Sequence, residues 1–196
     1  MGESDQESAV PVTIGGKPES SFSDPIGLLV DCHRRIERFL SVLEQVSTQA
    51  RGGPLTREQQ VALDTALRYF REAAPKHTAD EEESLFPRLR SVARPQLKTV
   101  LERIGALERD HARADTDHAE VDQLGEKWLA SGSLAPVDAE RFSSLVNELA
   151  LLYREHIAIE ESELFPAAAA VLERAERQVM GQEMKARRGL SNLDQS

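Results

Sequence analysis

Residues 77–87 read HTADEEESLFP, and residues 156–166 read HIAIEESELFP. The histidine, two adjacent glutamates, the leucine, the phenylalanine and the proline occupy the same places in both segments. A segment of this length that recurs 79 positions later indicates an internal duplication, with one copy in each half of the chain. The two copies are therefore the starting point for interpreting both the fold and the chemistry.

The sequence that leads into the first copy has the pattern of two amphipathic helices. Apolar residues recur at three- and four-residue spacing from Asp24 onward, and the segment RGGPL at 51–55 ends this stretch. A capping box of Thr56 and Gln59 opens the second stretch, which continues into the first copy. Because proline removes a backbone hydrogen bond, we expect Pro75 to kink this helix just ahead of the repeated histidine.

Two further stretches with helical spacing follow Pro95 and Val137, and the segment SGSLAP at 131–136 separates them. The last stretch runs through the second copy of the repeat towards Met180. No part of the sequence alternates convincingly with the two-residue period of a half-buried strand. Four long amphipathic stretches with short connections predict an all-α fold, namely an up-down-up-down antiparallel four-helix bundle.

The predicted bundle occupies residues 24–180. Residues 1–23 are rich in serine, glycine, glutamate and proline, and we expect them to form a flexible N-terminal leader. Residues 181–196 are weakly patterned, and we expect them to form a C-terminal tail. A chain of 196 residues suits one such domain with tails.

Charge and composition restrict the expected partners and location. The 34 acidic side chains outnumber the 24 basic ones, and the net charge of −10 disfavours binding to nucleic acid. No apolar run approaches the roughly 20 residues of a membrane span, and no secretory signal pattern is present. The single cysteine, Cys32, cannot form an internal disulfide, which favours a reducing compartment. We expect a cytoplasmic protein without a nucleic-acid or membrane partner, and no sequence feature identifies a protein partner.

Every histidine of the chain has a carboxylate four positions later. On a helix this spacing puts both side chains on one face, where an imidazole nitrogen and a carboxylate oxygen can hold one cation. Such pairs also occur as plain surface charge, but the repetition of the whole surrounding segment favours a metal site. The pairs are His33 and Glu37, His77 and Glu81, His111 and Asp115, His118 and Asp122, and His156 and Glu160.

Four of these histidines lie one on each predicted helix, where an antiparallel bundle can bring them to one level. They are His33, His77, His111 and His156. The twofold-like layout would flank two metal ions symmetrically, with Glu81 and Glu160 bridging them. Imidazole with carboxylate suits Fe, Zn, Mn or Cu, so the ligand types alone leave the metal open.

Other side chains are open to two interpretations. Glu37 and Asp115 are candidates for extra ligands or for partners that orient the histidines. Glu82 and Glu161 lie about 100° round the helix from the bridging carboxylates, and we expect them at the surface or behind the ligands. Tyr153 either points towards the site or is a core tyrosine. The leucine and phenylalanine of each copy are expected in the core, and the prolines are expected to bend or end the helix.

This pattern resembles the hemerythrin-like, or HHE cation-binding, family, which has a histidine on the first helix, HxxxE on the second, a histidine on the third and HxxxE on the fourth, followed by EExxLFP. The similarity covers roughly residues 24–180. It implies a hemerythrin-like bundle around a non-haem di-iron centre, with two Fe ions joined by an oxo or hydroxo bridge. By the matching motifs, His33 and His77 would bind one iron, His111 and His156 the other, and Glu81 and Glu160 both.

The third predicted helix departs from the oxygen carriers of that family. Those proteins have His-x-x-x-His there, whereas Asp115 follows His111 by four residues in this chain. His118 would lie about 10 Å along a regular helix from His111, too far to bind the same ion. The smaller number of nitrogen ligands argues against reversible oxygen carriage. The pattern is closer to iron-sensing hemerythrin-like domains with four histidines.

The resemblance implies a protein that binds or senses a small oxidant, namely O2, NO or peroxide, or iron itself, in oxygen binding or a stress response. Two alternatives stay open. One is a catalase-like enzyme that disproportionates peroxide, with His118, Tyr153 or Asp115 as an acid or base. The other is a non-redox interaction module that metal merely stabilises.

Overall fold

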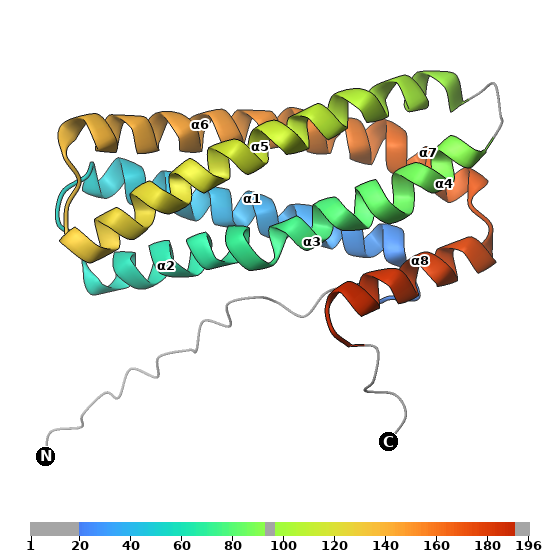
Figure 1. Cartoon of the computed structure of the whole chain (residues 1–196), viewed down its shortest axis with the longest axis horizontal. Helices are drawn as coiled ribbons and strands as arrows, with labels where there is room; N and C mark the ends of the chain where they lie inside the picture. The colour runs from blue at the N-terminus through green and yellow to red at the C-terminus, as the bar shows by residue number, and fades with distance from the viewer. Residues whose placement is uncertain (1–19, 93–96, 191–196) are drawn as a thin grey trace, which may run out of the picture.

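The computed structural model describes residues 20–92 and 97–190, and every regular element in these two ranges is a helix. The longest helices, α1 (Pro25–Ala50), α2 (Arg57–Glu72), α5 (Lys98–Ser131) and α6 (Pro136–Ile159), run along one common axis (Figure 1). Helix α1 packs beside α2 and α6, and α5 packs beside the same two helices. The predicted all-α fold is confirmed. Most of the expected leader, the expected break at Pro95 and the chain beyond residue 190 lie outside the described residues.

The loops at one end of the molecule are tied to each other. Helix α1 begins at its cap Asp24, whose side chain accepts a hydrogen bond from the Gly27 amide, and it ends in the left-handed turn at Arg51 and Gly52. The Gly52 carbonyl accepts from the Leu134 amide in the α5–α6 connection. The indole of Trp128 likewise donates to the Gly53 carbonyl at 2.9 Å. The turn at residues 51–55, which the sequence predicted, therefore also holds the α5–α6 connection in place through two hydrogen bonds.

Helix α2 starts at the predicted capping box, because the Thr56 hydroxyl accepts from the Gln59 amide and the Gln59 side chain accepts from the Thr56 amide. The helix is interrupted at Ala73 and resumes as α3 (Ala74–Ala79). This interruption is the expected effect of Pro75, which lacks an amide hydrogen and crowds the turn before it. The break lies between the core end of α2 and the first copy of the repeat.

Each copy of the repeat contains a widened, π-helical turn: η1 (Asp80–Leu85) continues as α4 (Phe86–Ser91), and η3 (Glu160–Leu164) continues as α7 (Phe165–Val171). The Phe86 amide donates to the Glu81 carbonyl, and the Phe165 amide donates to the Glu160 carbonyl, five residues back in each case. The next residue in both copies is a proline, which cannot bond to the preceding turn and needs extra room there. The prolines were expected to bend the helix, and the π turn is the form that the distortion takes.

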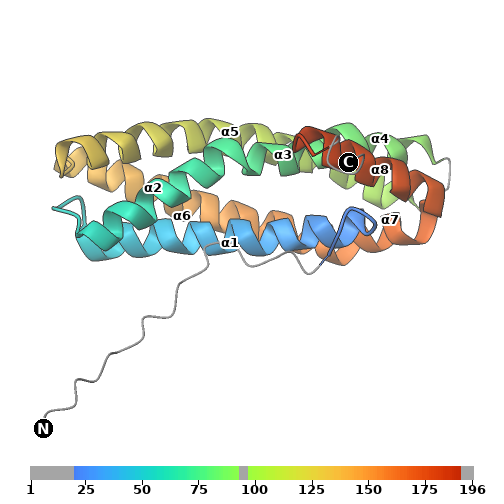
Figure 2. The same cartoon turned by 90° about the horizontal axis from the view of Figure 1, so that it is seen from below.

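The chain after residue 180 differs from the expected tail. Helix α8 (Arg174–Arg187) crosses the proposed boundary and packs against η1 and α1 (Figure 2). Met180, Gly181 and Met184 are its buried residues, a contact too narrow to produce a clear apolar stripe in the sequence. A side chain at position 181 would collide with the backbone oxygen of Phe22, so glycine permits this close approach.

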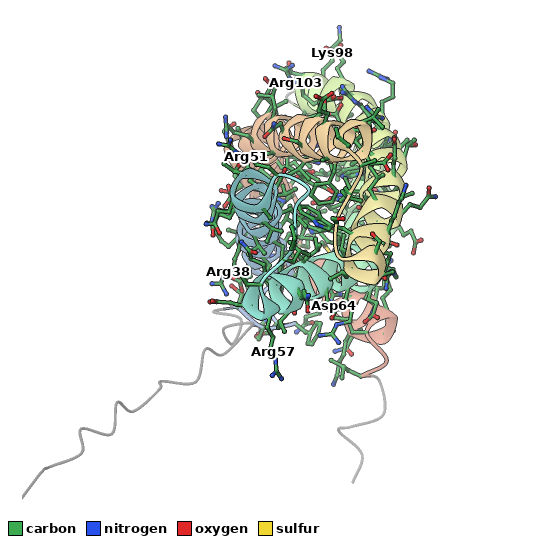
Figure 3. All side chains as sticks on the ribbon, turned by 90° about the vertical axis from the view of Figure 1, so that its left-hand side faces the viewer. Arg38, Arg51, Arg57, Asp64, Lys98 and Arg103 are labelled. Atoms are coloured by element: carbon green, nitrogen blue, oxygen red, sulfur yellow. The ribbon has the colours of Figure 1, made fainter. Side chains whose placement is uncertain are left out.

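The core consists of two apolar clusters separated along the helices. The larger one lies towards the Trp128 end of the bundle, and the smaller one is built around the leucine and phenylalanine of both repeat copies. Those four residues are at most 3% exposed, as expected. Viewed along the long axis, side chains fill the space between the helices, while labelled charges such as Arg57 and Lys98 point outward (Figure 3). None of the described helices is long and apolar enough to cross a membrane.

Candidate metal centre

A layer of buried polar side chains separates the two apolar clusters. Each long helical segment contributes to it, because α1, α3, α5 and α6 each place one histidine there, and each π turn places one glutamate. Every member is at most 5% exposed. The members are His33, His77, Glu81, His111, His156 and Glu160. These are the six residues singled out from the sequence, and the structure brings all of them together.

The six residues form two groups that share both glutamates. His33 and His77 belong to one group, and His111 and His156 belong to the other. Within each group, one nitrogen or oxygen atom from every residue lies within 4.8 Å of the others. This is the size of a site in which four side chains can surround one cation.

Each shared carboxylate has one oxygen near each group. Glu81 Oε1 lies 3.4 Å from His77 Nε2, and Glu81 Oε2 lies 3.4 Å from His111 Nε2. Glu160 Oε2 lies 3.1 Å from His33 Nε2, and Glu160 Oε1 lies 3.2 Å from His156 Nε2. Each of the two carboxylates therefore presents one oxygen to each group of histidines.

The π turns determine how the chain continues after these carboxylates. Glu81 and Glu160 lie at the start of η1 and η3, directly after the α-helical turn that carries His77 or His156. A π turn holds more residues than an α turn, so it changes the facing of everything that follows it. The i,i+4 spacing places each glutamate beside its histidine, and after the π turn Leu85 and its counterpart in the other copy pack into the apolar cluster.

The second glutamate of each copy lies behind a histidine on another helix. His33 Nδ1 is 2.9 Å from Glu161 Oε1, and His111 Nδ1 is 2.9 Å from Glu82 Oε1. When Nδ1 carries the hydrogen and donates it to the glutamate, Nε2 is left free to bind a cation. Glu82 and Glu161 thus occupy the position behind the ligands, one of the two positions expected for them.

The other two histidines have a different environment. The Nδ1 atoms of His77 and His156 are buried and have no hydrogen-bond partner in the described structure. Asp110 Oδ2 is 3.5 Å from His156 Nδ1, close enough for attraction if the ring is charged. The sequence analysis did not identify Asp110, because it lies on another helix and outside the repeated segment.

Burial dominates the electrostatics of the layer. Burial and the neighbouring charge of Glu160 hold the pKa of Glu81 well above its ordinary value. Burial also acts to raise the pKa of Glu160, but the adjacent imidazoles of His156 and His33 outweigh it and hold that pKa below its ordinary value. Burial lowers the pKa of His77 well below its ordinary value. Two carboxylates in one buried layer need protons or metal cations to neutralise them.

Three of the open candidates lie outside this layer. Glu37 is exposed and pairs with Arg34 at 2.9 Å. Asp115 lines a separate cavity with His118 and Tyr153, whose hydroxyl lies 3.3 Å from His118 Nε2. The structure therefore keeps Glu37 and Asp115 out of the two four-residue groups.

Sequence reasoning also missed the support of η1. Asp80 is completely buried, and its two oxygens contact Arg187 at 2.8 Å and Arg188 at 2.7 Å. The corresponding residue of the second copy is Ile159. That difference between two otherwise matching segments was the available signal, since a charged residue in place of an apolar one needs a partner when it is buried.

Comparison with known proteins gives the same assignment as the motifs. The family model described as the hemerythrin HHE cation binding domain matches residues 24–168, a range that contains all six residues of the layer. A protein of Haemophilus influenzae, described only as an uncharacterized protein, is 30% identical to this chain over 174 residues. The alignment covers 86% of this chain and 92% of the relative.

Proposed function

We propose, on the premise that this chain belongs to the hemerythrin HHE cation-binding domain family, that its buried layer holds two iron ions and that the protein binds or senses a small oxidant or iron itself. The small oxidant would be O2, NO or peroxide. His33 and His77 would hold one ion, His111 and His156 would hold the other, and Glu81 and Glu160 would bridge them. The long helices would form an up-down-up-down antiparallel four-helix bundle around this centre.

The observation that carries the proposal is a set of buried nitrogen and oxygen atoms that lie close together without hydrogen bonds. All four carboxylate oxygens of Glu81 and Glu160, and Nε2 of His33, are buried and make no hydrogen bond in the described structure. An uncompensated buried carboxylate is strongly unfavourable, and coordination to a cation is one of the few ways to stabilise it. Nitrogen and oxygen donors in this proportion fit a pair of divalent or trivalent transition-metal ions.

The choice of iron rests on the family, because this donor set also accepts zinc and manganese. An iron pair would supply redox chemistry towards small oxidants, which zinc does not. The chain's own contribution would be to exclude water with the apolar clusters on both sides, and to orient two imidazoles through Glu82 and Glu161. We further propose a cytoplasmic location and a role in the response to oxidants, consistent with the single cysteine, Cys32.

Metal analysis tests the proposal. After anaerobic reconstitution with ferrous iron and exposure to air, we expect two irons per chain and absorption in the near ultraviolet. Glu160→Gln should lose this iron, whereas the matched Glu163→Gln, on the same π turn but paired with Arg103, should keep it. Less than one iron per chain without that absorption would refute the proposal. A chain that retains only zinc and responds to neither NO nor azide would support the stabilised interaction module instead.

One observation favours the enzymatic alternative as a second candidate. Asp115, His118 and Tyr153 share a cavity beside the layer, so groups able to move protons lie close to the proposed centre. Peroxide disproportionation converts two H2O2 into two H2O and one O2, which an oxygen electrode follows directly. Equal oxygen release by the wild-type chain and His156→Ala would exclude this activity, because His156 belongs to the proposed centre.

A further inference from the structure

The cavity beside the buried layer has the features of a separate ligand site. It encloses about 380 Å³ and lies between α2, α3, α5 and α6. Pro75, at the start of α3, is part of the wall. None of the six residues of the layer lines the cavity. Its chemistry can therefore be considered apart from the metal centre.

One side of the cavity is apolar. Leu67, Phe70 and Val121 are at most 7% exposed and form this side. Phe70 also stacks on the ring of His118, with the ring centroids 4.2 Å apart and the planes inclined by 21°. A molecule that enters would meet a firm apolar surface, which favours a hydrocarbon body of matching size.

The cavity lining also includes an incompletely bonded polar pair, His118 and Tyr153. His118 Nε2 lies 3.3 Å from the Tyr153 hydroxyl, and His118 Nδ1 is buried without a partner. Burial lowers the pKa of His118 to about 4, so the imidazole is neutral at pH 7 and carries one hydrogen. The imidazole and the phenol together have two donor hydrogens, and their mutual contact uses one. One donor and one acceptor site are left, whichever tautomer His118 adopts.

The charges around the opening argue against an anionic ligand. Arg71 is already bound to Asp122, at 2.6 Å, and to Glu126. Asp115 adds a carboxyl group whose pKa is raised by burial. A cation would also be unfavourable, because it would have to give up water beside the apolar wall. The remaining class is a neutral molecule.

We propose that this cavity, lined by Phe70 and by the neighbouring His118–Tyr153 pair, binds a small neutral aromatic molecule that carries a hydroxyl group. A hydroxyl both donates and accepts, which matches the single donor and single acceptor that the pair leaves free. A molecule with a single aromatic ring fits the apolar wall and the available volume.

Phenol, toluene and benzoate are suitable probes, because they share a ring and differ in the polar group. Calorimetric or NMR titration of the full chain should give saturable phenol binding that is about fivefold to tenfold tighter than toluene binding, as one additional hydrogen bond provides. Benzoate should bind more weakly than phenol. In Tyr153→Phe the advantage of phenol over toluene should decrease, because the Tyr153 hydroxyl is lost, while toluene binding persists.

Ala119→Phe provides a test at an exposed residue, where a failure to fold is not expected. Ala119 lines the cavity on α5, and a phenylalanine there should fill it and weaken phenol binding at least tenfold. Ala130→Phe, at another exposed position of the same helix outside the cavity, should bind phenol like the wild type. The proposal is overturned if the wild-type chain shows no saturable phenol binding, if phenol and toluene bind equally, or if Ala119→Phe binds as the wild type does.

These titrations need no metal in the buried layer, because the cavity and the layer share no residue. Metal content is measured separately on the same preparation. A chain that holds no iron but binds phenol would therefore contradict the proposed function alone. A chain that holds iron but does not bind phenol would contradict only the proposal of a ligand site in the cavity.

Discussion

Glu161 on η3 lies 2.9 Å from Nδ1 of His33 on α1, although 128 positions separate the two residues in the sequence. Glu82 on η1 makes the same contact with His111 on α5. The second glutamate of each repeat copy thus supports a histidine of the other half of the chain. Neither half can build its part of the layer alone, which gives the duplication a structural consequence beyond symmetry.

This exchange predicts a specific loss of metal affinity. In Glu161→Ala, the His33 ring loses the acceptor that fixes its orientation and tautomer, and we expect metal affinity to fall by roughly 10- to 100-fold. Competition with a coloured chelator measures the change. The control is Glu163→Ala, two residues further along the same turn, where the lost partner is the exposed Arg103. If both variants retain metal equally well, the His33–Glu161 contact has no role in metal binding.

The His33–Glu161 contact also shows which parts of the site could be predicted from the sequence and which could not. His77 with Glu81 and His156 with Glu160 were accessible because helical spacing places residues i and i+4 together, and because the segment occurs twice. The contact between His33 and Glu161 could not be predicted, because it depends on which helices are neighbours and on the direction of the chain in η3. The spacing argument placed Glu161 at the surface or behind the ligands, without identifying His33 as the residue that it contacts.

Helix α8 is a second feature that the sequence pattern did not predict. A few buried residues hold it, and the side chains of Arg187 and Arg188 that contact η1 look like an ordinary basic tail in the sequence. A pattern of apolar residues predicts a helix that buries a wide face, whereas α8 combines a narrow apolar contact with ion pairs, among them those that reach the buried Asp80. Their partner, Asp80, was hidden inside an acidic run that contains three glutamates directly after it.

The buried carboxyl group of Glu81 should lower the stability of the metal-free chain at neutral pH while it favours metal binding. Burial and repulsion from Glu160 raise the pKa of Glu81, so the ionised form is unfavourable in the metal-free folded chain. A raised pKa means that the folded state holds a proton more tightly than the unfolded state does. The stability that this group contributes is therefore present at low pH and is lost as the pH rises from the ordinary glutamate value towards the folded one.

Glu81→Gln removes this pH-dependent penalty. We expect the metal-free variant to unfold at a higher temperature than the metal-free wild type at pH 7, and the two to converge at acidic pH. Added metal should raise the melting temperature of the wild type, since a ligand that binds only the folded state stabilises it, and should leave the variant nearly unchanged. Thermal scans with and without chelator provide the measurement. A metal-free Glu81→Gln chain that melts below the wild type at pH 7 would contradict the argument.

His118 predicts a second pH dependence, with a defined window. Burial lowers its pKa from the ordinary 6.5 to about 4. As the pH falls from 6.5 to 4, the unfolded chain takes up a proton at this residue while the folded chain does not, so the folded state loses stability. A shift of this size corresponds to roughly 3 kcal/mol over the whole window.

His118→Gln should reduce that loss. The variant is expected to be less stable than the wild type at pH 7, because the stacking on Phe70 is gone, but the difference should shrink as the pH falls towards 4. Urea denaturation at several pH values gives both free energies of unfolding. Parallel curves for the two proteins across this window would show that His118 does not titrate as its burial implies.

The contacts of Asp80 predict that α8 stabilises the fold through one carboxylate. Asp80 is fully buried, and its two oxygens accept from Arg187 and Arg188, while Arg187 also donates to the Ser84 hydroxyl at 2.8 Å. Asp80→Asn leaves two arginines without their buried counter-charge, which we expect to lower the free energy of unfolding by about 3 kcal/mol. Glu120→Gln is the matched control, because its partner Arg141 lies at the surface and the loss of an exposed pair has little effect.

Hydrogen exchange adds a local measurement of the same contact. Amides of α8 should exchange faster in Asp80→Asn, while those of α6 keep their protection. Unchanged exchange in α8 together with unchanged urea stability would mean that the apolar contacts of Met180 and Met184 hold the helix without the ion pairs.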